Sequence, residues 1–208
     1  TAQAQGFFTH EIIPVNIPQR KDDPIVVDTD EHPRASTTLE ALAKLKPVVT
    51  AEGTVTAGNA SGINDGAAAV LIASEQAIQQ YQLKPRAKII ASTAVGVEPR
   101  IMGFAPAPAI KKLLKQANLT IEQMDVIELN EAFAAQALAV TRDLGLADDT
   151  TQVNPNGGAI AIGHPLGASG ARLVTTALNQ LEQTGGTYAL CSMCIGVGQG
   201  IAMIIQRV

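Results

Sequence analysis

The chain has 208 residues, 46% of them hydrophobic and 16% charged, with a formal net charge of −4 at pH 7. This length and apolar content are enough to bury a core, as one large domain or two small ones, and the composition excludes a disordered chain or a coiled coil. The acidic balance and the lack of a basic run exclude a general affinity for nucleic acid, and the longest apolar run, residues 67–73, is too short to cross a membrane. Two cysteines and no signal-like start predict a reducing, cytoplasmic setting.

Residues 1–65 show little periodicity and predict a loop-rich lid or insertion rather than a self-sufficient domain. A strand is expected within residues 12–17. A short helix is expected further along, capped by Thr37 or Thr38 and stopped by Pro47.

From residue 66 onward, short apolar runs alternate with helical stretches. The expected strands are 87–95, 124–129, a short one near 153, 188–194 and 201–206, and the expected helices are a stretch ending at 81, 106–117, 130–144 and 166–183. This alternation predicts an α/β fold in which helices cover a parallel sheet that a final hairpin closes. It leaves the order of the strands open.

His164 stands between two glycine-rich segments at the mouth of the expected helix 166–183. An imidazole in such a place can exchange protons near neutral pH or donate to a developing oxyanion. The alternative is a structural histidine. His10 and His32 have no such context and are expected to be surface residues.

Asn130 directly follows the expected strand 124–129. Its side chain fits the N-cap of the expected helix 130–144, or its amide orients a water toward a carbonyl oxygen. Glu131 beside it is expected to serve the helix N-terminus, where negative charge is favourable.

Cys191 and Cys194 form a C-x-x-C pattern, which is compatible with a redox pair, half a metal site or two buried thiols. In an extended strand, a separation of three residues directs the two sulfur atoms to opposite faces, which argues against a disulfide. No second C-x-x-C exists, so no metal site is predicted. Cys194 is the better placed for a pocket, and Cys191 is expected to pack in the core.

The other glycine-rich stretches match neither a dinucleotide fingerprint nor a phosphate-binding loop with its lysine. Residues 56–66 offer backbone N–H groups and the Ser61 hydroxyl, which suit an amide-bearing ligand arm. Asn130, His164 and Cys194 are about one strand–helix unit apart, so these three side chains are expected to meet at the carboxyl ends of strands.

Together, four stretches resemble the thiolases, a family of thioester-dependent Claisen enzymes: 53–62, 130–133, 156–170 and 194–200. The likeness covers essentially the whole chain. Three stretches are most similar to the branch of the family that acts on β-ketoadipyl-CoA (3-oxoadipyl-CoA): 28–34, 127–135 and 188–208.

This resemblance implies a thiolase-like layered fold, with a mixed sheet covered by helices. Residues 1–65 match the end of the family's loop domain, 66–85 the last piece of its first core domain, and 86–208 the whole second core domain. The chain would thus contain one complete core domain plus part of a loop domain. The family's nucleophilic cysteine has no counterpart here, so the chain is expected to be a fragment that is inactive alone.

The resemblance also implies a two-step acyl exchange with coenzyme A as co-substrate and no permanently bound cofactor. In it, His164 would activate the nucleophile and donate to one thioester oxygen, and Asn130 would hold the water that completes this oxyanion site. Cys194 would act as acid and base, and the Gly196 N–H would help to hold the second oxyanion.

For substrate binding, the resemblance implies that Ser61 touches the pantetheine arm and that Met102 and Phe133, with Ala132, line its tunnel. Arg34 would lie near the nucleotide end. The complete enzyme would be a homodimer or homotetramer that cleaves 3-oxoadipyl-CoA to succinyl-CoA and acetyl-CoA. The alternatives are an acetoacetyl-CoA thiolase (acetyl-CoA acetyltransferase) and a non-catalytic acyl-CoA-binding module.

Overall fold

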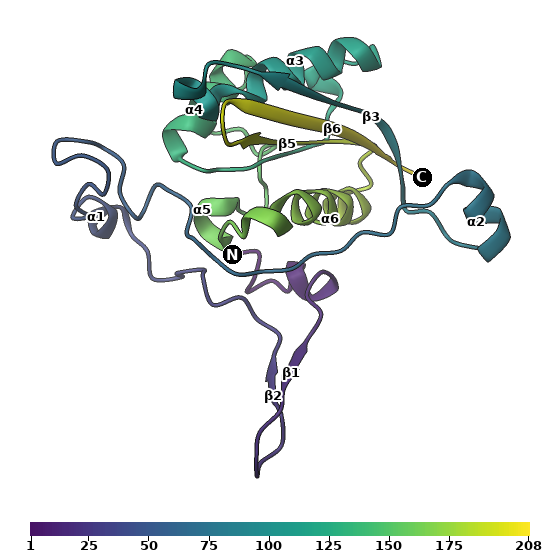
Figure 1. The fold of residues 1–208 in the computed structure, drawn as a ribbon, viewed down its shortest axis with the longest axis horizontal. Coiled ribbons are helices and arrows are strands. Elements are labelled where there is room, and N and C mark those ends of the chain that lie inside the picture. Colours follow the sequence, from purple (N-terminus) through teal and green to yellow (C-terminus); the bar gives the residue numbers. More distant parts are fainter.

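The computed structural model describes residues 1–208, and its centre is a four-stranded sheet with the order β3-β6-β5-β4 (Figure 1). β4 (Val126–Leu129) and β5 (Tyr188–Ile195) run parallel, whereas β6 (Gln199–Arg207) is antiparallel to both β5 and β3 (Ala87–Gly96). The mixed sheet implied by the resemblance is therefore confirmed. The parallel sheet predicted from the alternation holds only for β4 and β5, because β3 pairs with the returning strand of the final hairpin.

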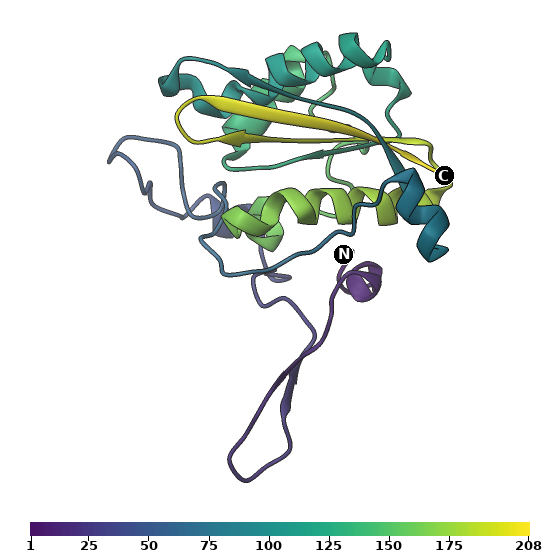
Figure 2. The same cartoon turned by 45° about the vertical axis from the view of Figure 1, so that its right-hand side comes forward.

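Helices cover both faces of the sheet and make a three-layered body (Figures 1 and 2). α3 (Pro106–Ala117) and α4 (Ala134–Asp143) lie on one face, and α6 (Leu166–Thr184) lies on the other, preceded by the short α5 (Ala159–Ile162). One buried apolar cluster joins the sheet to α3 and α4, and a second joins it to α6. No helix has the combination of length and apolarity that a membrane span requires.

The side chains of β4 alternate between these two clusters. Ile127 and Leu129 belong to the cluster under α3 and α4, and Val126 belongs to the cluster under α6. Glu128 also faces α6, where it forms an ion pair with a residue of that helix. Asn130 directly follows β4 and is also fully buried.

Several predicted helix ends agree with the structure. α3 has the predicted bounds, begins with Pro106 in its first turn and ends where Asn118 adopts a φ of 52°. α6 is followed by Gly185 with a φ of 74°, the left-handed conformation that terminates helices. Two short 3-10 helices, η2 (Pro99–Phe104) and η3 (Ile121–Gln123), flank α3 along the chain.

The predicted start of the helix at Asn130 is wrong. α4 begins at Ala134, and Phe133 occupies its cap position, so Asn130 is not an N-cap. A loop around residue 60 holds the intervening residues extended, since the carbonyl oxygen of Ala132 accepts the N–H of Ser61 at 3.0 Å. This long-range contact leaves the Asn130 side chain free for another role.

The first 86 residues are loop-rich, and Phe7 is the only buried residue before residue 105. Their regular elements are short: η1 (Phe7–His10), β1 (Val15–Ile17), β2 (Ile25–Val27), α1 (Leu39–Leu42) and α2 (Glu75–Tyr81). β1 and β2 form an antiparallel hairpin that projects away from the three-layered body, and β2 was not predicted (Figures 1 and 2). Thr38 caps α1, as the sequence indicates.

Asn154 closes the edge of β4 directly before Asn130. Its Oδ1 accepts the N–H of Leu129 at 2.9 Å, and its Nδ2 donates to the Leu129 carbonyl and to Glu131 Oε1, both at 2.8 Å. The amide therefore takes the place of a neighbouring strand. Asn154 also has a φ of 47°, a conformation that Asn adopts more readily than other residues with a side chain.

We expect Asn154→Ala to lower the free energy of unfolding by about 4 kcal/mol. About 1 kcal/mol comes from each of the three hydrogen bonds and about 1 kcal/mol from Ala at positive φ. Asn118→Ala is the matched control, because Asn118 also has a positive φ but its side chain makes no hydrogen bond; its expected cost is about 1 kcal/mol. Urea unfolding measures both variants, and equal losses would contradict a role for the amide contacts.

Candidate active site

The carboxyl ends of the parallel strands β4 and β5 lie side by side and carry two of the predicted site residues. The N–H of Asn130, just after β4, donates to the carbonyl oxygen of Ser192 in β5 at 2.9 Å. Cys194 lies two residues further along β5, opposite Gly200 of β6. This edge is where open α/β sheets place their ligand sites.

The structure brings His164 to this edge. His164 lies in the turn between α5 and α6, and its Nε2 is 3.2 Å from Nδ2 of Asn130. On the other side of the ring, Nδ1 is 2.6 Å from Oγ of Ser169, a buried residue in the first turns of α6.

These contacts define the tautomer of His164. The Ser169 hydroxyl donates its hydrogen to the Pro165 carbonyl at 3.1 Å, so its oxygen accepts from Nδ1–H of His164. Nε2 then carries the lone pair and accepts from the Asn130 amide. Burial lowers the pKa of His164, and the positive charge of Arg172 lowers it further. The imidazole is therefore a neutral base at neutral pH, with Nε2 directed at the site.

We expect Ser169→Ala to raise the proportion of the Nε2–H tautomer, because Nδ1 loses its only acceptor. Imidazole ¹⁵N chemical shifts measure this proportion directly. Thr175→Ala is the matched control, because its hydroxyl makes the same type of bond one helical turn back, to Ala171, without touching the histidine. An unchanged tautomer in Ser169→Ala would contradict the assignment.

The two cysteines face different layers. Cys191 belongs to the cluster under α6 and packs there, as predicted, and its burial raises the pKa of its thiol. Cys194 points to the opposite face of β5, and both thiols are free. Burial also raises the pKa of Cys194, with a smaller opposing effect from a backbone hydrogen bond. A thiol of this kind is protonated at neutral pH and can donate a proton.

Gly196 lies in the turn that joins β5 to β6 and is exposed. Its N–H has no backbone acceptor, whereas the carbonyl of Gly198 accepts the N–H of Val97 at 2.7 Å and anchors the turn. Gly198 has a φ of 86°, and a Cβ there would collide with the Val97 carbonyl oxygen. The anchored turn leaves the Gly196 N–H available close after Cys194.

Three of the predicted substrate-binding residues meet beside this edge. Besides the contact of Ser61 with Ala132, an isolated antiparallel bridge joins Ala60 to Phe133. The half-buried Met102 belongs to η2, which packs on α4. Arg34 is exposed and forms no hydrogen bond or ion pair through its side chain, so the structure does not join it to the others.

Comparisons with known proteins show which family the chain belongs to. Family models for the thiolase N-terminal domain and the thiolase C-terminal domain match residues 1–76 and 83–207. The chain belongs to the thiolase family.

Among the relatives of this thiolase chain is a beta-ketoadipyl-CoA thiolase of Acinetobacter baylyi, 84% identical over 207 residues, which cover 100% of the chain and 52% of the relative. A 3-oxoadipyl-CoA/3-oxo-5,6-dehydrosuberyl-CoA thiolase of Escherichia coli is 58% identical with the same coverage. The crystal structure of the Bacillus anthracis acetyl-CoA acetyltransferase is 43% identical with a TM-score of 0.94, covering 100% of the chain and 52% of that structure. The thiolase chain thus spans about half the length of the curated relatives it matches.

Two sequence expectations about single residues of the thiolase chain need correction. Glu131 serves the N-terminus of α5 rather than α4, because its carboxylate accepts the N–H of Ile160 at 3.2 Å. His32 is not a surface residue, since it is half-buried and its two ring nitrogens contact Asn64 and the Ile160 carbonyl.

Ser169 and Asn64 are hydrogen-bond partners of His164 that the sequence reasoning missed. The only sequence signal for Ser169 was its position five residues after His164, inside the same glycine-rich stretch. Asn64 is 100 residues away from His164 and carried no such signal.

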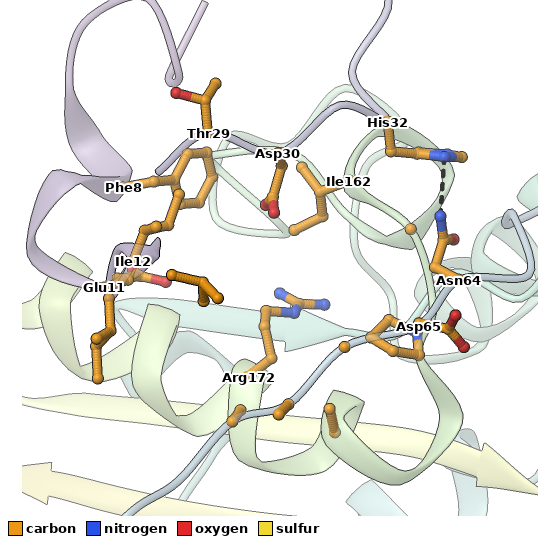
Figure 3. Close-up of a pocket in the computed structure, with 18 of the residues that line it drawn as sticks. Phe8, Glu11, Ile12, Thr29, Asp30, His32, Asn64, Asp65, Ile162 and Arg172 are labelled. Carbon is orange, nitrogen blue, oxygen red and sulfur yellow. Dashed lines mark hydrogen bonds between the residues drawn. The ribbon is translucent and has the colours of Figure 1, made fainter. Parts of the chain in front are cut away.

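A cavity of about 820 Å³ lies between the N-terminal segment and α6 (Figure 3), and neither Cys194 nor Asn130 belongs to its lining. Its lining includes Phe8, Glu11, Asp30 and Asn64, and the guanidinium group of Arg172 points into it. The cavity therefore lies behind the turn that carries His164, and it is distinct from the candidate active site.

Proposed function

We propose that this chain supplies the acid–base and oxyanion-binding groups of a thiolase that cleaves 3-oxoadipyl-CoA with coenzyme A. The observation that carries the proposal is the contact of the neutral base His164 with Asn130, at the strand edge where the protonated thiol of Cys194 also lies. The names of the relatives support the substrate. The nucleophilic cysteine comes from the part of the enzyme beyond these residues.

In the first step, Nε2 of His164 takes the proton of the nucleophilic thiol. The resulting thiolate attacks the 3-oxo carbonyl carbon, and the bond between C2 and C3 breaks. Cys194 gives its proton to C2, which releases acetyl-CoA and leaves a succinyl thioester on the nucleophile. Donation from a positioned acid of this kind typically contributes about 10²–10⁴-fold to the rate.

In the second step, the Cys194 thiolate takes the proton of coenzyme A, whose sulfur attacks the succinyl thioester. Succinyl-CoA leaves, and the nucleophile recovers its proton from the imidazolium of His164. Asn130 orients a water that donates, together with Nε2–H, to one developing oxyanion, and the Gly196 N–H donates to the other. One well-aimed oxyanion donor typically contributes about 3–4 kcal/mol to lowering the barrier.

The substrate is bound by residues along the same edge of the sheet. Ser61 and Ala132 contact the pantetheine arm, Phe133 and Met102 line its path, and Arg34 lies toward the nucleotide. The CoA complex of human mitochondrial 3-ketoacyl-CoA thiolase, which is 45% identical with a TM-score of 0.88 and covers 100% of the chain and 51% of that structure, supports a CoA site. Coenzyme A acts as a substrate and is not retained, and the complete enzyme is a cytoplasmic homodimer or homotetramer.

Steady-state thiolysis assays test this function. The complete enzyme is expected to cleave 3-oxoadipyl-CoA with a higher kcat/KM than acetoacetyl-CoA, and the purified 208-residue chain is expected to have no turnover. A preference for acetoacetyl-CoA would instead support an acetyl-CoA acetyltransferase. Turnover by the 208-residue chain, with its intact mass confirmed under denaturing conditions, would overturn the need for a second half.

A further inference from the structure

Three hydrogen bonds link distant segments to the turn that carries His164. The N–H of His164 donates to Oδ1 of Asn64 at 3.1 Å, Nδ2 of Asn64 lies 3.3 Å from Nδ1 of His32, and Nε2 of His32 lies 3.3 Å from the carbonyl oxygen of Ile160. The two ends of this series are in α5 and directly before α6. Figure 3 shows His32 and Asn64 facing each other beside the cavity.

The donors and acceptors of this series fit only one arrangement. A backbone N–H can only donate, so the oxygen of Asn64 faces His164 and its NH₂ group faces His32. Nδ1 of His32 must then accept, which leaves Nε2–H to donate to the Ile160 carbonyl. The N–H of His164 therefore sets the orientation of the Asn64 amide, and Nδ1 of His32 accepts from the NH₂ group and holds it there.

Two glycines provide the space that this series of hydrogen bonds needs. Gly163, directly before His164, has a φ of 93°, and a Cβ there would lie 2.5 Å from Oδ1 of Asn64. A Cβ on Gly62 would overlap the ring of His32. The glycines thus let two side chains approach the backbone of the turn closely, which is the second reason to regard the arrangement as specific.

Asn64 contacts the backbone of His164, whereas the other partners contact its ring. Asn130 and Ser169 hold the two nitrogen atoms of the His164 ring, but they do not touch its backbone. Asn64 is the protein acceptor for the His164 N–H, at the point where α5 has ended and α6 has not begun. The direction of the Cα–Cβ bond of His164 depends on this backbone contact.

We propose that Asn64 is a positioning residue for His164 and that His32 acts through Asn64. The part of this proposal that concerns catalysis rests on the proposed function. Both residues belong to the loop-rich N-terminal part, so that part holds the base in place in addition to contributing the Ser61 loop.

The first test uses the 208-residue chain and does not require activity. The chain has only three histidines, so labelling with [¹⁵N]histidine gives three backbone amide signals and three rings, assigned with the variants His10→Gln and His32→Ala. In Asn64→Ala, the His164 amide is expected to exchange with solvent about tenfold faster, and its ring to lose its single tautomer. Asn64→Asp keeps the acceptor and is expected to retain slow exchange at His164 while it changes the ring of His32.

The control is Asp65→Ala, which removes the neighbouring exposed side chain on the cavity wall and is expected to change none of these signals. Circular dichroism establishes that each variant is folded. Folded Asn64→Ala with unchanged exchange at His164 would overturn the proposal.

The second test measures thiolysis in the complete enzyme. Asn64→Ala is expected to lower kcat about tenfold with little change in KM, since a small displacement of a catalytic base affects the transition state more than binding. His32→Ala is expected to lower kcat on its own but not in the Asn64→Ala background, which is the signature of an effect transmitted through Asn64. Additive losses would overturn the role of His32. An inactive complete enzyme whose variants still show the changed histidine signals would refute the proposed function and support the positioning role.

Discussion

Replacing Cys194 with alanine is expected to lower kcat for thiolysis by about 10³-fold in the complete enzyme, because it removes the acid that we propose protonates C2 of the departing acetyl-CoA. Burial supports this role, since it raises the pKa of the thiol and keeps it protonated at neutral pH. Steady-state kinetics with 3-oxoadipyl-CoA measures the loss.

Cys191→Ala is the matched control. Cys191 is three residues away on the same strand, is equally buried and packs under α6 on the opposite face. Its removal is expected to cost some stability and to leave kcat within about twofold, because a buried structural thiol takes no part in the chemistry. Equal losses in the two variants would show that the strand, and not the Cys194 thiol, is what catalysis requires.

The pH dependence gives a separate check on the same assignment. Cys194 donates only when protonated, so kcat is expected to fall as pH rises through the pKa of its thiol, which burial places above the usual range. His164 accepts only when neutral, so activity is expected to fall as pH drops through its pKa, which burial and Arg172 place below the usual range. In Cys194→Ser, the alkaline limb is expected to disappear while the acid limb remains.

Local sequence signals predicted the second half of the chain well. α3 and α6 could be predicted because their apolar stripes end at residues that stop helices, Asn118 and Gly185. The meeting of Asn130 with His164 was predicted from the α/β alternation, although His164 follows the short α5 rather than a strand. These features depend on contacts within one or two elements.

The sequence reasoning failed where distant segments decide the conformation. The sequence around Asn130 is typical of a helix start, but the Ser61 loop and Asn154 hold that stretch extended through hydrogen bonds from 23 or more residues away. No periodicity reports a contact of this kind. The partners of His164 divide in the same way, because Asn130 was predicted from strand topology whereas Asn64 was found only from the folded chain.

β1 lies within the strand predicted at residues 12–17, but β2, its partner in the short hairpin, escaped prediction for a different reason. Each strand has three residues and all six are exposed, so there is no buried face to produce an alternating pattern. The antiparallel part of the sheet could not be predicted from local sequence patterns either, because the pairing of β3 with β6 joins residues near 90 to residues near 204.

Replacing Arg172 with methionine is expected to destabilise the fold by about 3–5 kcal/mol at pH 9, because it leaves the carboxylate of Glu128 buried without a partner. Arg172 Nη1 is 2.7 Å from Glu128 Oε2, and the Glu128 side chain is 0% exposed. Burial raises the pKa of Glu128 to about 7, although Arg172 opposes this shift. Without Arg172 the pKa of Glu128 rises further.

The sign of the pH effect follows from that raised pKa. A carboxyl group whose pKa is higher in the folded state stabilises the fold at low pH, and this contribution is lost as pH rises toward and through the folded-state value. The difference between Arg172→Met and the unmodified chain is therefore expected to widen between pH 5 and pH 9 in urea unfolding. Glu11 lines the same cavity as Arg172, and burial raises the pKa of its carboxyl while Arg172 opposes that shift. Glu11 is therefore expected to widen the stability difference between Arg172→Met and the unmodified chain further.

Two further variants separate this mechanism from a general loss of packing. Arg142→Met breaks the exposed pair with Asp148 and is expected to cost little at any pH. The double variant Glu128→Gln with Arg172→Met removes both charges and is expected to recover most of the stability at pH 9. If the single Arg172→Met loss were the same at pH 5 and pH 9, the buried carboxylate would not be its cause. In the complete enzyme, Arg172→Met is also expected to move the acid limb of the kcat profile to higher pH, because the charge of Arg172 lowers the pKa of His164.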